Sequence, residues 1–160
     1  MRFRSLLAIA AWLAGAVLAR PAHAQSVAPE IKRVNPPGLG TPRGYTHVVT
    51  ATGGKTIWIA GQVSQDAKGE VVGKGDLKAQ TLQVFANLKT ALGAAGASFQ
   101  DVVKMNTYVV GLTPEALQAI RDVRAEVLRD VPPPASTLVG VTALARPDYL
   151  IEIEVVAVVR

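Results

Sequence analysis

The chain has 160 residues, 49% of them hydrophobic, with a formal net charge of +5 and no cysteine. Without cysteine it can form no disulfide framework, and thiol catalysis and thiolate metal sites are excluded as well. Three arginines and no acid lie within the first 24 residues. Without that segment the net charge falls from +5 to +2. A charge this mild disfavours nucleic acid and anionic membranes as partners.

Residues 1–24 have the pattern of a secretory signal peptide. Two arginines precede an apolar run, and Ala22 and Ala24 supply the small residues typical of a cleavage site. The alternative is an uncleaved membrane anchor, but the run is shorter than the roughly 20 apolar residues that a spanning helix needs. We therefore expect a periplasmic or secreted protein with no membrane association after cleavage.

Residues 25–44 are rich in Pro and Gly and show no periodicity, so we expect a loosely ordered lead-in before a domain at 45–160. The apolar stretches 45–51 and 56–63 flank Gly53-Gly54, a pair suited to a tight hairpin. A second turn, at residues 66–69, follows directly. The first part of the domain is thus predicted to be antiparallel sheet.

Two helices are predicted from their start signals and their apolar spacing. Asp76 is an N-cap candidate for the first helix, which Gly93 or Gly96 ends. Thr113 and Pro114 begin the second helix with a capping hydroxyl and a proline in the first turn. The charged residues of this second helix recur near helical spacing and are interpreted as a solvated face: Arg121, Arg124, Glu126, Arg129 and Asp130.

Three further strands are predicted at 102–110, 135–141 and 149–159, from their β-branched residues and the turn signals around them. Right-handed crossovers between strand, helix and returning strand place both helices on the same side of the sheet. The predicted fold class is therefore α+β, a mixed β-sheet with two helices packed on one face.

The last predicted strand has a mixed second face. Alternation places Glu152 and Glu154 on the same side as Val156 and Val158. Solvent on that side would expose the valines, whereas complete burial would desolvate two carboxylates at a cost of several kcal/mol. A partner subunit over the valine end, with a polar cleft at the glutamate end, resolves both problems. The pattern therefore favours an oligomer with an interfacial pocket.

No catalytic or metal-binding motif stands on its own in the sequence. His47 is interpreted as structural, because a lone histidine near a hairpin usually is. Glu152 and Glu154 are either acid–base residues in a cleft or solvated strand residues. Lys104 and Asn106 share one strand face, where they either line the same pocket or form part of an exposed edge.

Five short motifs lie in this order along about residues 31–160: Ala60-Gly61-Gln62-Val63, Asn87-Leu88-Lys89, Val102-Val103-Lys104, Pro134 to Val139, and Ile151-Glu152-Ile153-Glu154 with the four residues after it. In sequence and in order they resemble the motifs of the RidA (YjgF/YER057c/UK114) family. The resemblance implies a chorismate-mutase-like α+β domain and a homotrimer with a ligand cleft at each subunit interface. It also implies hydrolysis of 2-imino acids or their enamine tautomers to 2-keto acids and ammonia, without metal or organic cofactor.

The resemblance also implies roles for individual residues. Glu152 matches the glutamate that orients the attacking water. Tyr45 and Gly61 match residues that border the cleft, and the backbone N–H of Leu138 falls where a donor meets the keto or imine group. Asn106 is expected to line the same substrate pocket, from its place on the strand face.

Ser136 departs from the family's pattern. Active deaminases resemble PARS at this point, and their arginine holds the substrate carboxylate through two parallel hydrogen bonds, which a serine hydroxyl cannot supply. Losing that pair weakens carboxylate binding by roughly 2–5 kcal/mol, unless Arg146 or Arg121 reaches the cleft. The expected activity is thus an imine or enamine deaminase weakened by Ser136. The alternative is a non-catalytic periplasmic ligand-binding or protein-protecting module, while a ribonuclease role is disfavoured by the low charge.

Overall fold

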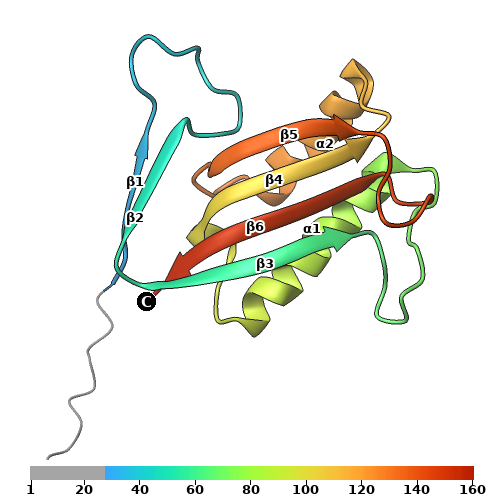
Figure 1. Cartoon of the computed structure of the whole chain (residues 1–160), viewed down its shortest axis with the longest axis horizontal. Helices are drawn as coiled ribbons and strands as arrows, with labels where there is room; N and C mark the ends of the chain where they lie inside the picture. The colour runs from blue at the N-terminus through green and yellow to red at the C-terminus, as the bar shows by residue number, and fades with distance from the viewer. Residues whose placement is uncertain (1–27) are drawn as a thin grey trace, which may run out of the picture.

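The computed structural model describes residues 28–160, so the predicted signal peptide at 1–24 lies outside the described residues. Figure 1 shows a curved sheet backed by two helices, with a separate hairpin at one end. In chain order the elements are β1 (Glu30–Val34), β2 (Val48–Thr52), β3 (Lys55–Val63), α1 (Leu77–Ala94), the short 3-10 helix η1 (Phe99–Asp101), β4 (Val102–Val110), α2 (Pro114–Val127), β5 (Ala135–Val141) and β6 (Ile151–Val159).

A four-stranded mixed sheet in the order β3-β6-β4-β5 forms the body of the domain. β6 runs antiparallel to both of its neighbours. β4 and β5 are parallel, because α2 crosses back over the sheet between them. Both helices cover the same face of this sheet (Figure 1). The predicted α+β class, with two helices on one face of a mixed sheet, is therefore confirmed.

The hairpin of β1 and β2 lies apart from the main sheet and corrects two expectations. Residues 30–34 form β1 inside the segment expected to be a loosely ordered lead-in. The expected pairing across Gly53-Gly54 is also wrong, because β2 pairs with β1 while β3 pairs with β6. The two glycines have φ angles of 73° and 74°. They therefore form a bend between two sheets, and β3 gains a buried partner in β6 that β2 does not offer.

Both helices begin at the capping residues that the sequence predicts. Asp76 accepts a hydrogen bond from the backbone N–H of Ala79 at 3.0 Å, and Thr113 accepts one from that of Ala116 at 3.2 Å. α1 ends shortly before Gly96, whose φ of 76° lets the chain turn toward η1.

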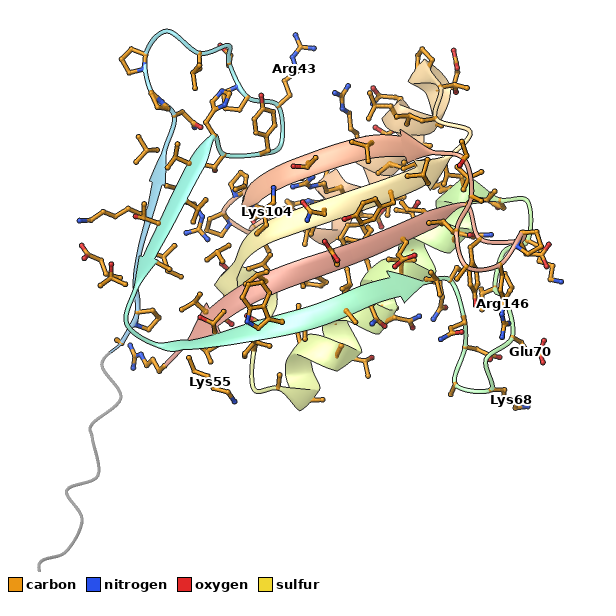
Figure 2. All side chains as sticks on the ribbon, in the orientation of Figure 1. Arg43, Lys55, Lys68, Glu70, Lys104 and Arg146 are labelled. Atoms are coloured by element: carbon orange, nitrogen blue, oxygen red, sulfur yellow. The ribbon has the colours of Figure 1, made fainter. Side chains whose placement is uncertain are left out.

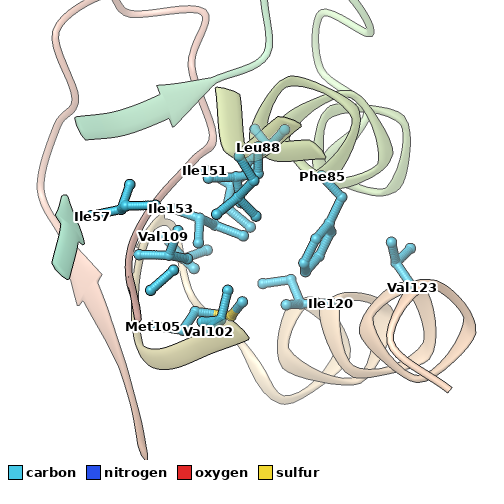
Figure 3. Close-up of a cluster of buried hydrophobic side chains, with 14 residues drawn as sticks. Ile57, Phe85, Leu88, Val102, Met105, Val109, Ile120, Val123, Ile151 and Ile153 are labelled. Atoms are coloured by element: carbon cyan, nitrogen blue, oxygen red, sulfur yellow. The ribbon is translucent and has the colours of Figure 1, made fainter. Parts of the chain in front are cut away.

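The hydrophobic core lies between the sheet and the two helices (Figure 3). The inward residues of β6 are almost fully buried, as their alternation predicts. They pack with side chains from both helices and from β4 into one cluster. Its most buried members include Val84, Phe85, Leu88, Leu92, Met105, Val109, Ile120, Val123, Ile151, Ile153 and Val155.

The outward face of β6 corrects part of the argument for an oligomer. Val158 is only 4% exposed, because Gly54 and Pro29 of the same chain lie close to it. A partner subunit is therefore not needed to cover this valine. The exposed apolar side chains of this helix-free face lie on other strands, since Trp58 of β3 is 77% exposed and Val139 of β5 is 41% exposed.

A fully buried glutamine joins α1 to the start of β6. The amide nitrogen of Gln80 donates to the carbonyls of Gly73 at 3.2 Å and Asp148 at 2.8 Å, and its oxygen accepts from the N–H of Leu150 at 2.9 Å. Gln80→Leu should lower the free energy of unfolding by about 1–3 kcal/mol, because these backbone groups lose their partner. Urea unfolding tests this, with Gln118→Leu on the exposed side of α2 as the control. Equal midpoints for the two variants would contradict the expectation.

Candidate functional site

Glu152 lies against Gly61 on the helix-free face of the sheet. The register of β3 with β6 shifts between Ile59 and Gln62, and this irregularity contains Gly61. A Cβ atom at Gly61 would overlap the carboxylate of Glu152, so only glycine leaves that carboxylate in place. The structure thus brings two of the predicted site residues into direct contact.

Glu154 follows on the same face and has two hydrogen-bond donors on β4. Asn106 Nδ2 donates to Glu154 Oε1 at 2.8 Å, and the Tyr108 hydroxyl donates to the same oxygen at 3.0 Å. Asn106 therefore lies on the predicted face, as a partner of Glu154. Tyr108 was missed, although its alternation with Lys104 and Asn106 on one strand placed it on this face.

The hydrogen bond to Glu154 raises the pKa of Tyr108 above its ordinary value of 10.0, and burial and the charges of Glu154 and Glu152 act in the same direction. Ionisation would place a phenolate beside two carboxylates, so the neutral phenol is favoured. Ultraviolet titration should show a late-ionising tyrosine, which Tyr108→Phe removes and Glu154→Gln returns toward the ordinary range. A titration curve unchanged by Glu154→Gln would contradict this assignment.

A hollow of about 280 Å³ lies beside Glu154 on the helix-free face. Lys104 borders it, and its ammonium group donates to Thr137 Oγ1 at 2.9 Å (Figure 2). The exposed Trp58 forms part of the same lining. The helix-free face therefore combines carboxylates, an amide, a cation and an uncovered aromatic ring.

A second group of predicted residues lies on the other side of the sheet. Tyr45, Ser136 and Leu138 line a cavity of about 540 Å³ between α2, β5 and the loop before β2. In the parallel register, Ser136 pairs with Met105 of β4 and Leu138 pairs with Thr107. Met105 and Thr107 are buried on the helix side of the sheet, so Ser136 and Leu138 lie on that side as well. Most of the remaining lining is apolar, and it includes Phe85, Leu112, Leu117, Ile120, Leu128 and Val131.

A polar contact at the wall of this cavity comes from Arg124, one of the residues that the sequence assigns to a solvated face. Arg124 Nη1 donates to Ser136 Oγ at 3.1 Å, and burial lowers the pKa of the guanidinium. The earlier interpretation is wrong for Arg124, which follows the buried Ile120 by four residues and precedes the half-buried Val127 by three. This spacing puts Arg124 on the inward stripe of α2, and it was the signal available in the sequence.

The two arginines proposed to replace the missing cation differ in position. Arg146 donates to the carbonyl of Gly69 at 3.0 Å and lies over the ring of Tyr149, in the loops at the far end of the sheet from Arg43 (Figure 2). It does not line the cavity. Arg121 does line it and is exposed.

The lone histidine of the described residues has a structural role. His47 Nε2 lies 2.7 Å from the carbonyl oxygen of Gly40, and the backbone N–H of His47 donates to Asn35 Oδ1. These two contacts hold the loop between β1 and β2. Within residues 28–160, no three or more His, Cys, Asp or Glu side chains gather in a way that could hold a metal ion. No helix in the same range has the length and apolar character of a membrane span.

The fold and the site define a class of small α+β domains with an open sheet face, where a carboxylate lies over a glycine, and an apolar cavity behind the edge strand. The family model described as "Endoribonuclease L-PSP" matches residues 39–159 of the chain. The chain belongs to this family, whose members are also named RidA and YjgF/YER057c/UK114. The family resemblance seen in the sequence motifs is therefore confirmed.

Several relatives are similar over most of the chain. A RutC family protein of Pyrococcus horikoshii is 41% identical over 114 residues, covering 71% of this chain and 85% of the relative. A Dermatophagoides farinae protein named 2-iminobutanoate/2-iminopropanoate deaminase is 31% identical over 107 residues, covering 67% and 80%. The crystal structure of YyfB, a Rid family protein of unknown function from Yersinia pestis, has 44% identity and a TM-score of 0.77, covering 81% of this chain and 98% of that one.

Proposed function

We propose that the protein is a homotrimer whose interfacial clefts bind a small metabolite and hydrolyse 2-imino acids or enamines to 2-keto acids and ammonia. The division of the site residues between the two faces of the sheet carries this proposal. Gly61 and Glu152 lie on the open face, whereas Tyr45, Ser136 and Leu138 lie on the helix side. The sheet separates the two groups within one chain, so a neighbouring copy is needed to complete the cleft.

The open face has the properties of a subunit interface. Trp58 is 77% exposed and Val139 is 41% exposed, and both point away from the helices. Apolar side chains exposed together on one face of a sheet favour association. Cyclic symmetry then presents the open face of each copy to the next, which places one Glu152 at each interface.

The chemistry needs a positioned water, donors that polarise the C=N group, and a group that holds the substrate. Glu152 accepts a proton as water adds to the imine carbon. Leu138 lies in the edge strand β5, where alternate backbone N–H groups have no neighbouring strand and remain available to a ligand. The deaminase name of the Dermatophagoides farinae relative supports the reaction, and the N-terminal pattern supports a periplasmic or secreted location.

The experiment is an ammonia-release assay. An amino acid oxidase generates 2-iminopropanoate in solution, and ammonia is followed with and without the purified protein. We expect the protein to accelerate the release. If neither the natural protein nor Ser136→Arg accelerates it, the deaminase proposal fails.

Ser136 is the observation that favours a second function, a non-catalytic periplasmic ligand-binding or protein-protecting module. A binder without turnover needs no carboxylate fork aligned for reaction. Thermal-shift screening separates the two functions, because any tight ligand raises the unfolding temperature by mass action. Stabilisation by a metabolite in the absence of imine hydrolysis would favour the binding module.

A further inference from the structure

We propose that Arg124 of α2 replaces the absent strand arginine and holds the carboxylate of a small acid with an apolar body in the cavity beside Ser136. This assignment names the ligand class of the cleft and rests on the proposed function only for the cleft's location. The cation thus comes from a helix, in place of the neighbouring strand.

The hydrogen bonds of Arg124 point to a missing acceptor. Its Nη1 donates to Ser136 Oγ at 3.1 Å, while its Nη2 is buried and has no hydrogen-bond partner among the described residues. A guanidinium carries five N–H donors, and a buried donor without an acceptor is costly. A planar carboxylate at this point would accept from Nη2 and satisfy it.

The charges around the cavity favour an anion. Its charged lining residues are Arg43, Arg121 and Arg124, and the described lining contains no acid. Arg43 projects from the loop before β2 (Figure 2). The ion pairs found within residues 28–160 join Lys32 to Glu30 and Lys74 to Asp148, so Arg124 takes part in neither. The cation is therefore not neutralised by the chain itself.

The rest of the lining defines the body of the ligand. Phe85, Met105, Leu117, Ile120 and Leu128 contribute apolar surface. A volume of about 540 Å³ suits a small metabolite. An acid with a branched or aromatic side chain buries that side chain here, whereas a sugar leaves its hydroxyl groups unpaired against the apolar lining.

A purely structural role for Arg124 fits the contacts less well. An arginine that only braces a fold has its buried donors satisfied by acceptors of the protein, whereas Nη2 of Arg124 is not. The contact found for Arg124 is with a neutral serine hydroxyl, and it lies at the cavity wall. The guanidinium and the hydroxyl together form a donor pair directed at one ligand.

Calorimetric titration with phenylpyruvate, and with its uncharged methyl ester, tests the assignment. The purified protein should bind the acid and not the ester. Arg124→Gln should weaken binding of the acid by about 30-fold or more, as expected for loss of one member of a buried charge pair. Arg124→Lys, which keeps the charge without the fork, should fall between the two. Arg129→Gln, an exposed residue near the end of α2, should bind as the natural protein does.

Rescue gives the sharpest readout. Adding Ser136→Arg to Arg124→Gln should restore binding of the acid, because the cation returns from the strand. Circular dichroism of each variant shows whether it is folded. If Arg124→Gln is unfolded, Arg124→Lys takes its place in the binding test. Unchanged affinity in Arg124→Gln and Arg124→Lys, equal binding of the ester, or no binding by the natural protein would each overturn the assignment.

The failure of this assignment and that of the proposed deaminase are distinguishable. If the natural protein binds phenylpyruvate, Arg124→Gln loses this binding, and no ammonia is released from imines, then the carboxylate site is retained and the deaminase function is rejected. If Arg124→Gln hydrolyses imines at the natural rate, then the deaminase function is retained and the carboxylate site at Arg124 is rejected.

Discussion

Replacing Glu152 by glutamine is expected to lower imine hydrolysis by about 100-fold or more, the contribution typical of a positioned general base. Glutamine keeps the shape of the side chain but cannot accept a proton from the attacking water. Carboxylate binding and oligomeric mass should stay unchanged. The kcat for ammonia release measures the effect, and Glu126→Gln on the exposed face of α2 is the control. A Glu152→Gln protein with the natural rate would contradict the assignment.

Gly61→Ala should also lower the kcat for ammonia release, by displacing the carboxylate of Glu152. The added methyl group overlaps the carboxylate of Glu152 and forces it out of place. Gly93→Ala is the matched control, because it adds the same methyl group on α1 where nothing lies within 4 Å. A loss in kcat for Gly61→Ala alone is expected. Equal rates for the two variants would show that the position of Glu152 does not matter.

Val139→Glu and Trp58→Glu are expected to dissociate the proposed trimer into single chains. Each places a carboxylate in the apolar area of the open face, which association would have to desolvate. Leu82→Glu is the matched control, since Leu82 of α1 and Val139 are both 41% exposed but Leu82 lies on the helical side. Analytical ultracentrifugation should give the mass of one chain for the two sheet variants and of three chains for Leu82→Glu. A full-sized assembly for both sheet variants would place the interface elsewhere.

The parts of the fold that local chemistry determines were predictable from the sequence. The strands at 102–110 and 135–141 have the predicted limits, and Asp76 and Thr113 cap the helices as expected. Strand pairing was not predictable in the same way. The bend at Gly53-Gly54 is compatible both with a hairpin and with a change of sheet, and the long-range partner β6 decides between them.

The same distinction between local and long-range interactions applies to the candidate site. Gly61 and Glu152 were singled out from short local motifs, whereas their direct contact depends on the pairing of β3 with β6. Arg124 was hidden because its neighbours on the helix are charged and exposed, and only its spacing from Ile120 marked it as inward. The cover over Val158 could not be foreseen, since it comes from Gly54 and Pro29 through the unpredicted position of the first hairpin.

Co-expression of two inactive variants tests most directly whether each cleft is shared between copies. Glu152→Gln lacks the open-face carboxylate, and Ser136→Trp fills the cavity on the helix side. Mixed trimers should recover about one quarter of the natural rate of ammonia release, because random assembly places both intact halves at one interface in four. If the mixed assemblies contain both chains and remain inactive, both halves of the site belong to the same chain and the shared cleft does not exist.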